Sequence, residues 1–259
     1  MKLIKFLLPV AFIFCLTGCV EINEQIDIKP NGSGQWVTKM DMSQLLDMMQ
    51  TYMGKDEMDK QLPSKKMDTT ILFKTFVDTS TSISPEKKAL LRDGKIGMKL
   101  NMDEKIFKTE MNFPFTSLNN LQKLYTSLGD GSIGTTDLLK GLTAGKADSA
   151  SPVGNMQSPD ITQFNNIYDF KSKDGFISRK VNQEKLKALL DNPQLSQMKD
   201  AGNMGVEIPY TIVINLPRAV KKVDNPLAAI STDKKTVTIK YNLIEMLNTP
   251  QKFEYSIEY

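Results

Sequence analysis

The sequence contains three copies of the Ser-x-x-Lys pattern, in which a serine could act as a nucleophile and a lysine as its base. They lie at Ser84–Lys87, Ser196–Lys199 and Ser231–Lys234. A working site of this kind also needs a Lys-Thr-Gly or Ser-Asp-Asn partner, and the sequence contains neither. Because Pro85 follows Ser84, the first copy is better interpreted as a helix N-cap with proline at the first helical position.

The composition excludes several other reaction types. The 259 residues include no histidine, which rules out Ser-His and Cys-His nucleophile pairs and histidine-ligated zinc. With 33 basic and 30 acidic residues, the chain also lacks the excess of positive charge that a nucleic-acid-binding protein needs. We therefore expect no enzymatic activity, no cofactor and no nucleic-acid partner.

Methionine is enriched in one part of the chain, since seven of the 15 methionines lie between Met40 and Met67. Thioethers are soft ligands that suit Cu(I), but methionine also fills irregular gaps in a core or forms a pliable surface for an apolar ligand. The acidic segment 56–59 lacks the alternating oxygen ligands and central glycine of a calcium loop. We favour core packing for the methionines and predict no metal site.

The N-terminal segment has the features of an export signal. Lys2 and Lys5 precede an apolar run of eleven residues, 6–16, which is too short to cross a bilayer as a helix. The sequence Leu16-Thr17-Gly18-Cys19 follows, and it resembles the lipobox of bacterial lipoproteins. The resemblance implies that residues 1–18 are a signal peptide, removed by cleavage, and that Cys19 is acylated, with palmitate for example. The protein would then be exported and held on an envelope membrane, with membrane lipid as its partner.

Alternation of apolar and polar residues predicts β-strands that pair as hairpins, and most hairpins are followed by a helix. In the first predicted strand, Ile22, Ile26 and Ile28 share one face. Helices are expected to begin near residues 43, 117, 183 and 242. The first of them should turn its apolar residues to the core: Leu45, Met48, Met49, Tyr52 and Met53. This order of elements favours an α+β fold of antiparallel β-hairpins alternating with short helices, with one or two sheets packed on the helices.

A change of composition divides the mature chain. The stretch 129–163 is rich in glycine, serine and aspartate, and no aromatic residue occurs between Tyr125 and Phe164, which indicates a flexible loop or linker. It separates an N-terminal hairpin-helix part, 19–128, from a C-terminal one, 164–259. Whether the two parts close one shared sheet or form two domains stays open at this stage.

Beyond the lipobox, the layout resembles the LppM-like family of bacterial envelope lipoproteins. The residues that carry the resemblance are the strand Glu21–Ile28 beside the cysteine, its turn at Asn31–Gly34, and two C-terminal strands, Thr236–Tyr241 and Lys252–Tyr259, around Asn248–Pro250. The chain departs from that family in having no C-terminal transmembrane helix, and its middle matches no known pattern. The resemblance implies a non-enzymatic envelope protein that binds lipid.

The sequence therefore leaves three functions open. The first is a membrane-anchored, non-catalytic lipoprotein that acts as a binding or assembly module, through an envelope protein for example. The second is a carrier that encloses an apolar, lipid-like ligand between sheet and helices, which requires an apolar cavity. The third is an envelope hydrolase, which requires two converging carboxylates, one of them with a raised pKa. The sequence identifies Cys19 as the lipidation site and leaves the ligand-binding residues unknown.

Overall fold

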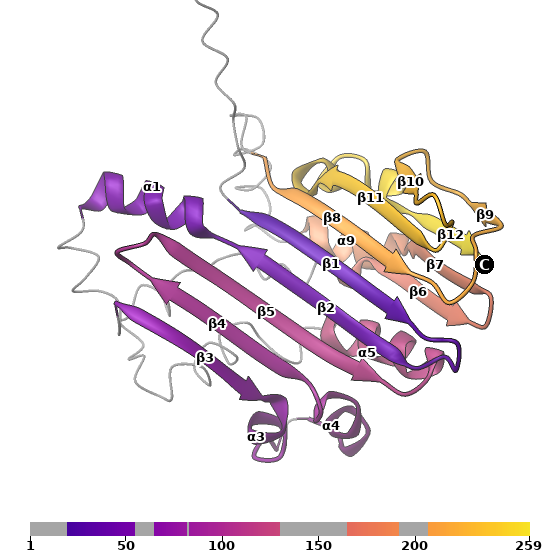
Figure 1. The fold of residues 1–259 in the computed structure, drawn as a ribbon, viewed down its shortest axis with the longest axis horizontal. Helices are drawn as coiled ribbons and strands as arrows, with labels where there is room; N and C mark the ends of the chain where they lie inside the picture. Colours follow the sequence, from indigo (N-terminus) through magenta and orange to yellow (C-terminus); the bar gives the residue numbers. More distant parts are fainter. Residues whose placement is uncertain (1–19, 55–64, 82, 130–164, 192–206) are drawn as a thin grey trace, which may run out of the picture.

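The computed structural model describes residues 20–54, 65–81, 83–129, 165–191 and 207–259. Strands from these ranges form an eight-stranded sheet and a four-stranded sheet, with helices on one face of the large sheet (Figure 1). The predicted α+β class is therefore confirmed. The strands are β1 (Glu21–Ile28), β2 (Gly34–Asp41), β3 (Lys66–Leu72), β4 (Lys95–Asn101), β5 (Ile106–Phe115), β6 (Tyr168–Lys173), β7 (Phe176–Val181), β8 (Pro209–Asn215), β9 (Lys222–Val223), β10 (Ala228–Ile230), β11 (Thr236–Asn242) and β12 (Tyr255–Glu258).

The large sheet has the strand order β10-β11-β8-β1-β2-β5-β4-β3. Its neighbours pair antiparallel except for β1 and β8, which run parallel, with Ile22 opposite Tyr210 and Ile26 opposite Ile214. The expected hairpins are antiparallel, and the one parallel junction joins two strands that are far apart in the sequence. The parallel pair also answers the question of the shared sheet, because β1 comes from the predicted N-terminal part and β8 from the C-terminal part.

The small sheet has the order β6-β7-β12-β9 and is antiparallel throughout. The two C-terminal strands that the sequence suggested as a pair are not paired, because β11 belongs to the large sheet and β12 to the small one. The chain crosses between the sheets through two short 3₁₀ helices, η1 (Leu243–Leu247) and η2 (Pro250–Phe253). Asn242 caps η1 as predicted, since its side-chain oxygen accepts a hydrogen bond from the Ile244 backbone N–H.

The α-helices begin close to the predicted positions. They are α1 (Ser43–Met53), α3 (Phe73–Val77), α4 (Pro85–Leu91), α5 (Leu118–Gly129) and α9 (Gln183–Leu190). Ser84 caps α4, with its hydroxyl accepting from the Lys87 N–H, which confirms the structural interpretation of the first Ser-x-x-Lys copy. Strand β3 and helix α3 were not predicted, although Met67, Thr69 and Ile71 alternate with more exposed residues in the manner of a strand.

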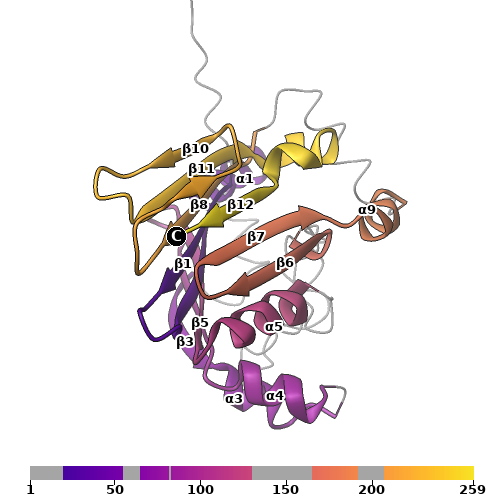
Figure 2. The same ribbon diagram turned by 90° about the vertical axis from the view of Figure 1, so that its right-hand side faces the viewer.

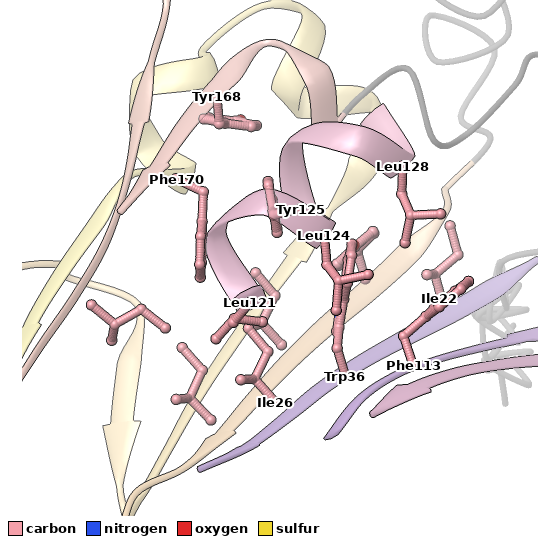
Figure 3. Close-up of a cluster of buried hydrophobic side chains, with 14 of the residues drawn as sticks. Ile22, Ile26, Trp36, Phe113, Leu121, Leu124, Tyr125, Leu128, Tyr168 and Phe170 are labelled. Carbon is pink, nitrogen blue, oxygen red and sulfur yellow. The ribbon is translucent and has the colours of Figure 1, made fainter. Parts of the chain in front are cut away.

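Helix α5 packs beside β6, the edge strand of the small sheet, and lies with that sheet against the same face of the large sheet (Figure 2). Its Tyr125 ring stacks on Trp36 of β2 at 5.1 Å between ring centroids and on Phe170 of β6 at 4.4 Å, as Figure 3 shows. The Ser172 hydroxyl of β6 also donates a hydrogen bond to the Leu118 carbonyl of α5. The core therefore lies between the large sheet on one side and the small sheet with α5 on the other, and aromatic rings fill the space between these described elements.

Helix α1 projects from the end of the sheet at which β1 begins (Figure 1). Its buried anchor is Leu46, 3% exposed, which packs with Leu100 and Met102. The predicted core face was therefore wrong for two residues, because Met48 is 39% and Tyr52 is 84% exposed. The reason is that α1 extends beyond the strands and packs through Leu46 and Met49, which leaves the face with Met48 and Tyr52 uncovered by the described residues. The packing partners are Met67, Leu100, Met102 and Phe107.

The start of α1 is held by a hydrogen bond to β5. Met42 occupies the N-cap position of α1, without a side-chain hydrogen bond to cap the helix. The Ser43 hydroxyl accepts a hydrogen bond from the Phe107 N–H instead and ties the helix to β5. Met40 packs on the main core, whereas Met49 packs with Met67 and Met102 around Leu46, so these methionines contribute to apolar packing. The predicted loop over 129–163 lies outside the described residues apart from Gly129, and so does the acidic segment 56–59.

We predict that Leu46→Ala lowers the free energy of unfolding by about 2–5 kcal/mol, because it leaves a cavity against Leu100 and Met102. Tyr52→Ala, on the same helix, should change it by no more than about 0.5 kcal/mol, because its ring is exposed. Urea unfolding of the two variants measures the difference. Equal effects of the two substitutions would contradict the described docking of α1.

Candidate functional site

Two polar regions stand out in the described residues, one buried and one at the surface. The buried one lies between the two sheets and is called here the inter-sheet polar cluster. It comprises Glu24, Tyr125, Arg179, Tyr210 and Tyr241. Glu24 on β1 and Arg179 on β7 are both completely buried, at 0% exposed. Such burial is unusual for charged side chains unless they are paired or hydrogen-bonded.

The Arg179 guanidinium is held by four hydrogen bonds. Its Nε and Nη2 donate to the Phe253 carbonyl at 3.2 and 3.0 Å, Nη1 donates to the Tyr125 hydroxyl at 3.3 Å, and Nη2 donates to the Tyr241 hydroxyl at 3.0 Å. The Tyr168 ring lies 4.4 Å from the guanidinium carbon, in position for a cation–π interaction. Because Tyr241 belongs to the large sheet and Arg179 to the small one, these bonds join the sheets directly.

Glu24 faces this guanidinium from the large sheet. Its Oε2 accepts a 2.6 Å hydrogen bond from the Tyr210 hydroxyl and lies 3.9 Å from Arg179 Nη1. Burial raises the pKa of Glu24 above its ordinary value, and the opposing effects of Arg179, Tyr210 and the nearby Trp36 indole do not reverse this. Burial also raises the pKa of Tyr210, so its hydroxyl stays protonated and donates to the carboxylate.

Some polar atoms of this region lack partners. Within the described part of the chain, Glu24 Oε1, Trp36 Nε1 and the Tyr255 hydroxyl are buried without a hydrogen bond of good geometry. The Trp36 indole is close enough to Glu24 to lower the pKa of the carboxyl, but its N–H does not have the geometry of a hydrogen bond. An incompletely satisfied cluster is costly, so a stable sandwich must offset it through the surrounding aromatic packing.

The surface region is a shallow groove of about 560 Å³ on the outer face of the large sheet, opposite the helices. It crosses β1, β2, β5, β4 and β3 and centres on Gly97, which carries no side chain between Thr70 and Glu110 in the strand register. The charged side chains on its walls are four basic and four acidic: Lys39, Lys95, Lys99, Lys108, Glu21, Asp41, Asp68 and Glu110. Positive and negative side chains are therefore equal in number on the walls of the groove.

Several of these charges are paired or hydrogen-bonded across the strands. Lys108 Nζ lies 2.8 Å from Asp41 and Lys39 Nζ lies 3.6 Å from Glu110. Burial alone would raise the pKa of Asp41, but hydrogen bonds from Lys108 and Ser43 outweigh it and lower the pKa. These partners keep Asp41 ionised, so its carboxyl does not suit the role of a general acid, which must carry a proton.

The outer face also carries a hydrogen-bonded row beside the groove. The Asp27 carboxylate accepts from Asn215 at 2.6 Å, from Gln35 at 2.7 Å and from Gln25 at 2.8 Å. Burial favours a raised pKa for Asp27, but these three bonds outweigh it and lower the pKa. The row runs through β2, β1 and β8, so it reinforces the central strands beside the parallel junction.

The residues predicted from the sequence are placed as follows. Cys19 lies just outside the described residues, which begin at Val20, and β1 starts one residue later at Glu21. Among the described residues, no group of three His, Cys, Asp or Glu side chains could hold a metal ion. In the same ranges, no helix has the length and apolar character needed to cross a membrane.

Glu24 and Arg179 were not identified from the sequence. Glu24 occupies the buried face of β1 between Ile22 and Ile26, so the alternation that marks the strand could have indicated it. Arg179 follows Ile177 on β7 at the same spacing of two. Their proximity, however, depends on two strands 155 positions apart, and no local pattern indicates which buried polar residues meet.

No family model matches the chain, and no curated protein matches it in sequence. Among solved structures, the folded domain of the LppM protein from Mycobacterium tuberculosis is similar over 93% of this chain and 90% of that chain. The TM-score is 0.37 and the sequence identity is 6%.

The inter-sheet polar cluster predicts a pH-dependent effect of Arg179→Met. Removing the guanidinium takes away an interaction that lowers the Glu24 pKa, so the carboxyl becomes harder to ionise in the folded state. A raised folded-state pKa means that stability falls as pH rises above the ordinary carboxyl value of 4.5. We expect a loss of about 3–5 kcal/mol near neutral pH and a smaller loss in mild acid.

Urea unfolding at about pH 5 and about pH 8 measures both effects. Glu24→Gln is the matched control, because glutamine can still accept from Tyr210 and cannot ionise. In the Glu24→Gln background, Arg179→Met should lose its additional pH dependence and keep the cost of the lost hydrogen bonds. A pH dependence that persists in the double variant would contradict the role assigned to Glu24.

Proposed function

We propose that this protein is a membrane-anchored, non-catalytic lipoprotein of the bacterial envelope that acts as a binding or assembly module. The observation that carries the proposal is the position of the lipobox cysteine relative to the fold. Cys19 precedes Glu21, the first residue of β1, by two positions, and β1 lies in the interior of the large sheet. An anchor on Cys19 would hold this sheet close to the lipid headgroups without an intervening linker.

Acylation is energetically sufficient for such an anchor. Each buried acyl methylene contributes about 0.8 kcal/mol, and a single chain holds a protein only weakly, whereas two or three hold it stably. Removal of Lys2 and Lys5 with the signal would leave 31 of the 33 basic residues against 30 acidic ones, so electrostatic attraction to anionic lipid is small. Membrane binding would therefore depend on the acyl chains.

The chemistry of the described residues supports a non-catalytic role. The one acidic group with a raised pKa, among the groups with a resolved shift in the described ranges, is Glu24, and it is sealed between the sheets away from solvent. Ser84 is engaged as a helix cap. The space where a carrier would hold an acyl chain contains the stacked rings of Trp36, Tyr125 and Phe170. These features favour a binding module over a hydrolase or a carrier.

The groove on the outer face is the binding surface that we assign to this module. Its even mixture of lysines and carboxylates suits a polar partner that presents both donors and acceptors, and it gives no long-range attraction to a highly charged one. The groove begins at the end of the sheet where β1 starts, with Glu21 and Asp41 on its wall, and extends across β5 and β4 to β3, so a partner could reach it from the side while the protein is anchored.

The anchor is tested by labelling cells with a fatty-acid analogue and analysing the N-terminal peptide by mass spectrometry. We expect the wild-type protein to begin at acylated Cys19 and to remain in the membrane fraction after a high-salt wash. Cys19→Ala should lose both the label and the membrane association. A wild-type N-terminus upstream of Cys19 would overturn the assignment.

The groove is tested by photo-crosslinking in cells with a reactive amino acid at Lys95, on its wall, or at Lys187, on the outside of α9. Adducts are expected from position 95 and should be lost with Gly97→Val, which fills the groove. The new Cβ would lie 3.3 Å from the Thr70 hydroxyl, a contact that a small rotation of that side chain relieves, and the fold should persist. Adducts that survive Gly97→Val unchanged would show that the groove is not the binding surface.

A further inference from the structure

The exposed side chains of α1 lie at the end of the molecule where the described chain begins, at Val20. In the register of β1 and β2, Glu21 is opposite Asp41, and α1 begins two residues after Asp41. The first described residues and the start of α1 therefore lie at the same end of the strands of the large sheet, as Figure 1 shows. Any surface that holds Cys19 is adjacent to α1.

The composition of α1 suits contact with a lipid surface. Its eleven residues include no basic side chain, and its one acidic residue, Asp47, lies 2.6 Å from Lys105 Nζ of the β4–β5 turn. Tyr52 and Met48 project from the helix, with 84% and 39% of their surfaces exposed. Tyrosine is favoured at membrane interfaces because its ring enters the apolar layer while its hydroxyl stays hydrated.

The helix is also held firmly enough to present these residues. Leu46 is buried against Leu100 and Met102, the Gln50 side chain donates to the Met102 carbonyl at 2.9 Å, and Ser43 accepts from Phe107. About 16 Å of helix, at 1.5 Å per residue, therefore extends rigidly along this edge. By contrast, Leu72, another large exposed apolar residue, lies at the opposite end of the sheet, where β3 ends.

We propose that α1 rests on the membrane that holds the acylated Cys19, with Tyr52 and Met48 in the interfacial layer. This inference rests on the proposed anchor and adds a second, weaker contact to it. Two contacts at the same end of the strands would fix the tilt of the large sheet relative to the membrane. A single acylated residue would allow the domain to change its orientation. The orientation of the outer groove and its distance from the membrane surface would then be fixed.

The test uses the single tryptophan of the chain. Trp36 is buried, so its fluorescence supplies a constant background, and Tyr52→Trp adds a reporter on α1. Leu72→Trp is the matched control at the far end of the sheet. The acylated full-length proteins are incorporated into vesicles of phosphatidylethanolamine and phosphatidylglycerol, with or without lipids brominated near the headgroup end of the acyl chain.

We expect brominated lipid to reduce the added emission of Tyr52→Trp, and that emission to shift to shorter wavelength. Leu72→Trp should show neither change. If the proteins float with the vesicles but Tyr52→Trp behaves like Leu72→Trp, the inference about α1 is wrong while the anchor holds. If the proteins do not float, the proposed anchor itself fails and the inference falls with it. A blue shift without quenching, accompanied by self-association, would assign α1 to a second copy of the chain and overturn the membrane contact.

Discussion

The burial of the Arg179 guanidinium between two sheets constrains much of this structure. A guanidinium has five N–H donors and cannot lose its proton, so every side of it must meet an acceptor or an aromatic face. The chain supplies these from α5, β11 and η2, three elements that are far apart in sequence. The crossing of the chain from β11 to β12 through η2 places the Phe253 carbonyl where it accepts two of the donors.

The same constraint explains the layered core. Tyr125 contributes its hydroxyl to Arg179 and its ring to the stack between Trp36 and Phe170, so one residue of α5 joins the polar and apolar parts of the interface. Stacked rings contribute about 0.5–1.5 kcal/mol per pair beyond the area that they bury. This packing surrounds Glu24 and keeps solvent from its carboxylate. A charged residue in a core therefore acts here as a connector of layers, distinct from the polar groove on the outside.

The two surfaces that matter for the proposed function adjoin each other. The end of the sheet where β1 begins leads to Cys19 and carries the helix α1, and the groove on the broad outer face starts at that end, with Glu21 and Asp41 on its wall. Because β1 is an interior strand held by β2 and β8, a force applied at its first residue is shared across the sheet. A protein anchored in this way keeps its broad face available to a partner.

Much of the local structure followed from the sequence. Alternation of Ile22, Ile26 and Ile28 is encoded within eight residues, Ser84-Pro85 marks a helix start, and Asn242 caps η1 through its own side chain. These features depend on neighbouring residues, so the order of residues determines them. The lipobox-like sequence Leu16–Cys19 is likewise a contiguous pattern, so the prediction that Cys19 is acylated needs no fold.

Only the tertiary structure decided which segments meet. The parallel pairing of β1 with β8, the division of β11 and β12 between two sheets, and the meeting of Glu24 with Arg179 all join distant parts of the chain. The exposure of Tyr52 was missed for the same reason, because helical periodicity indicates a face but not whether another element covers it. Local patterns state what a segment can bury, whereas the partner that buries it depends on how side chains from separate segments pack together.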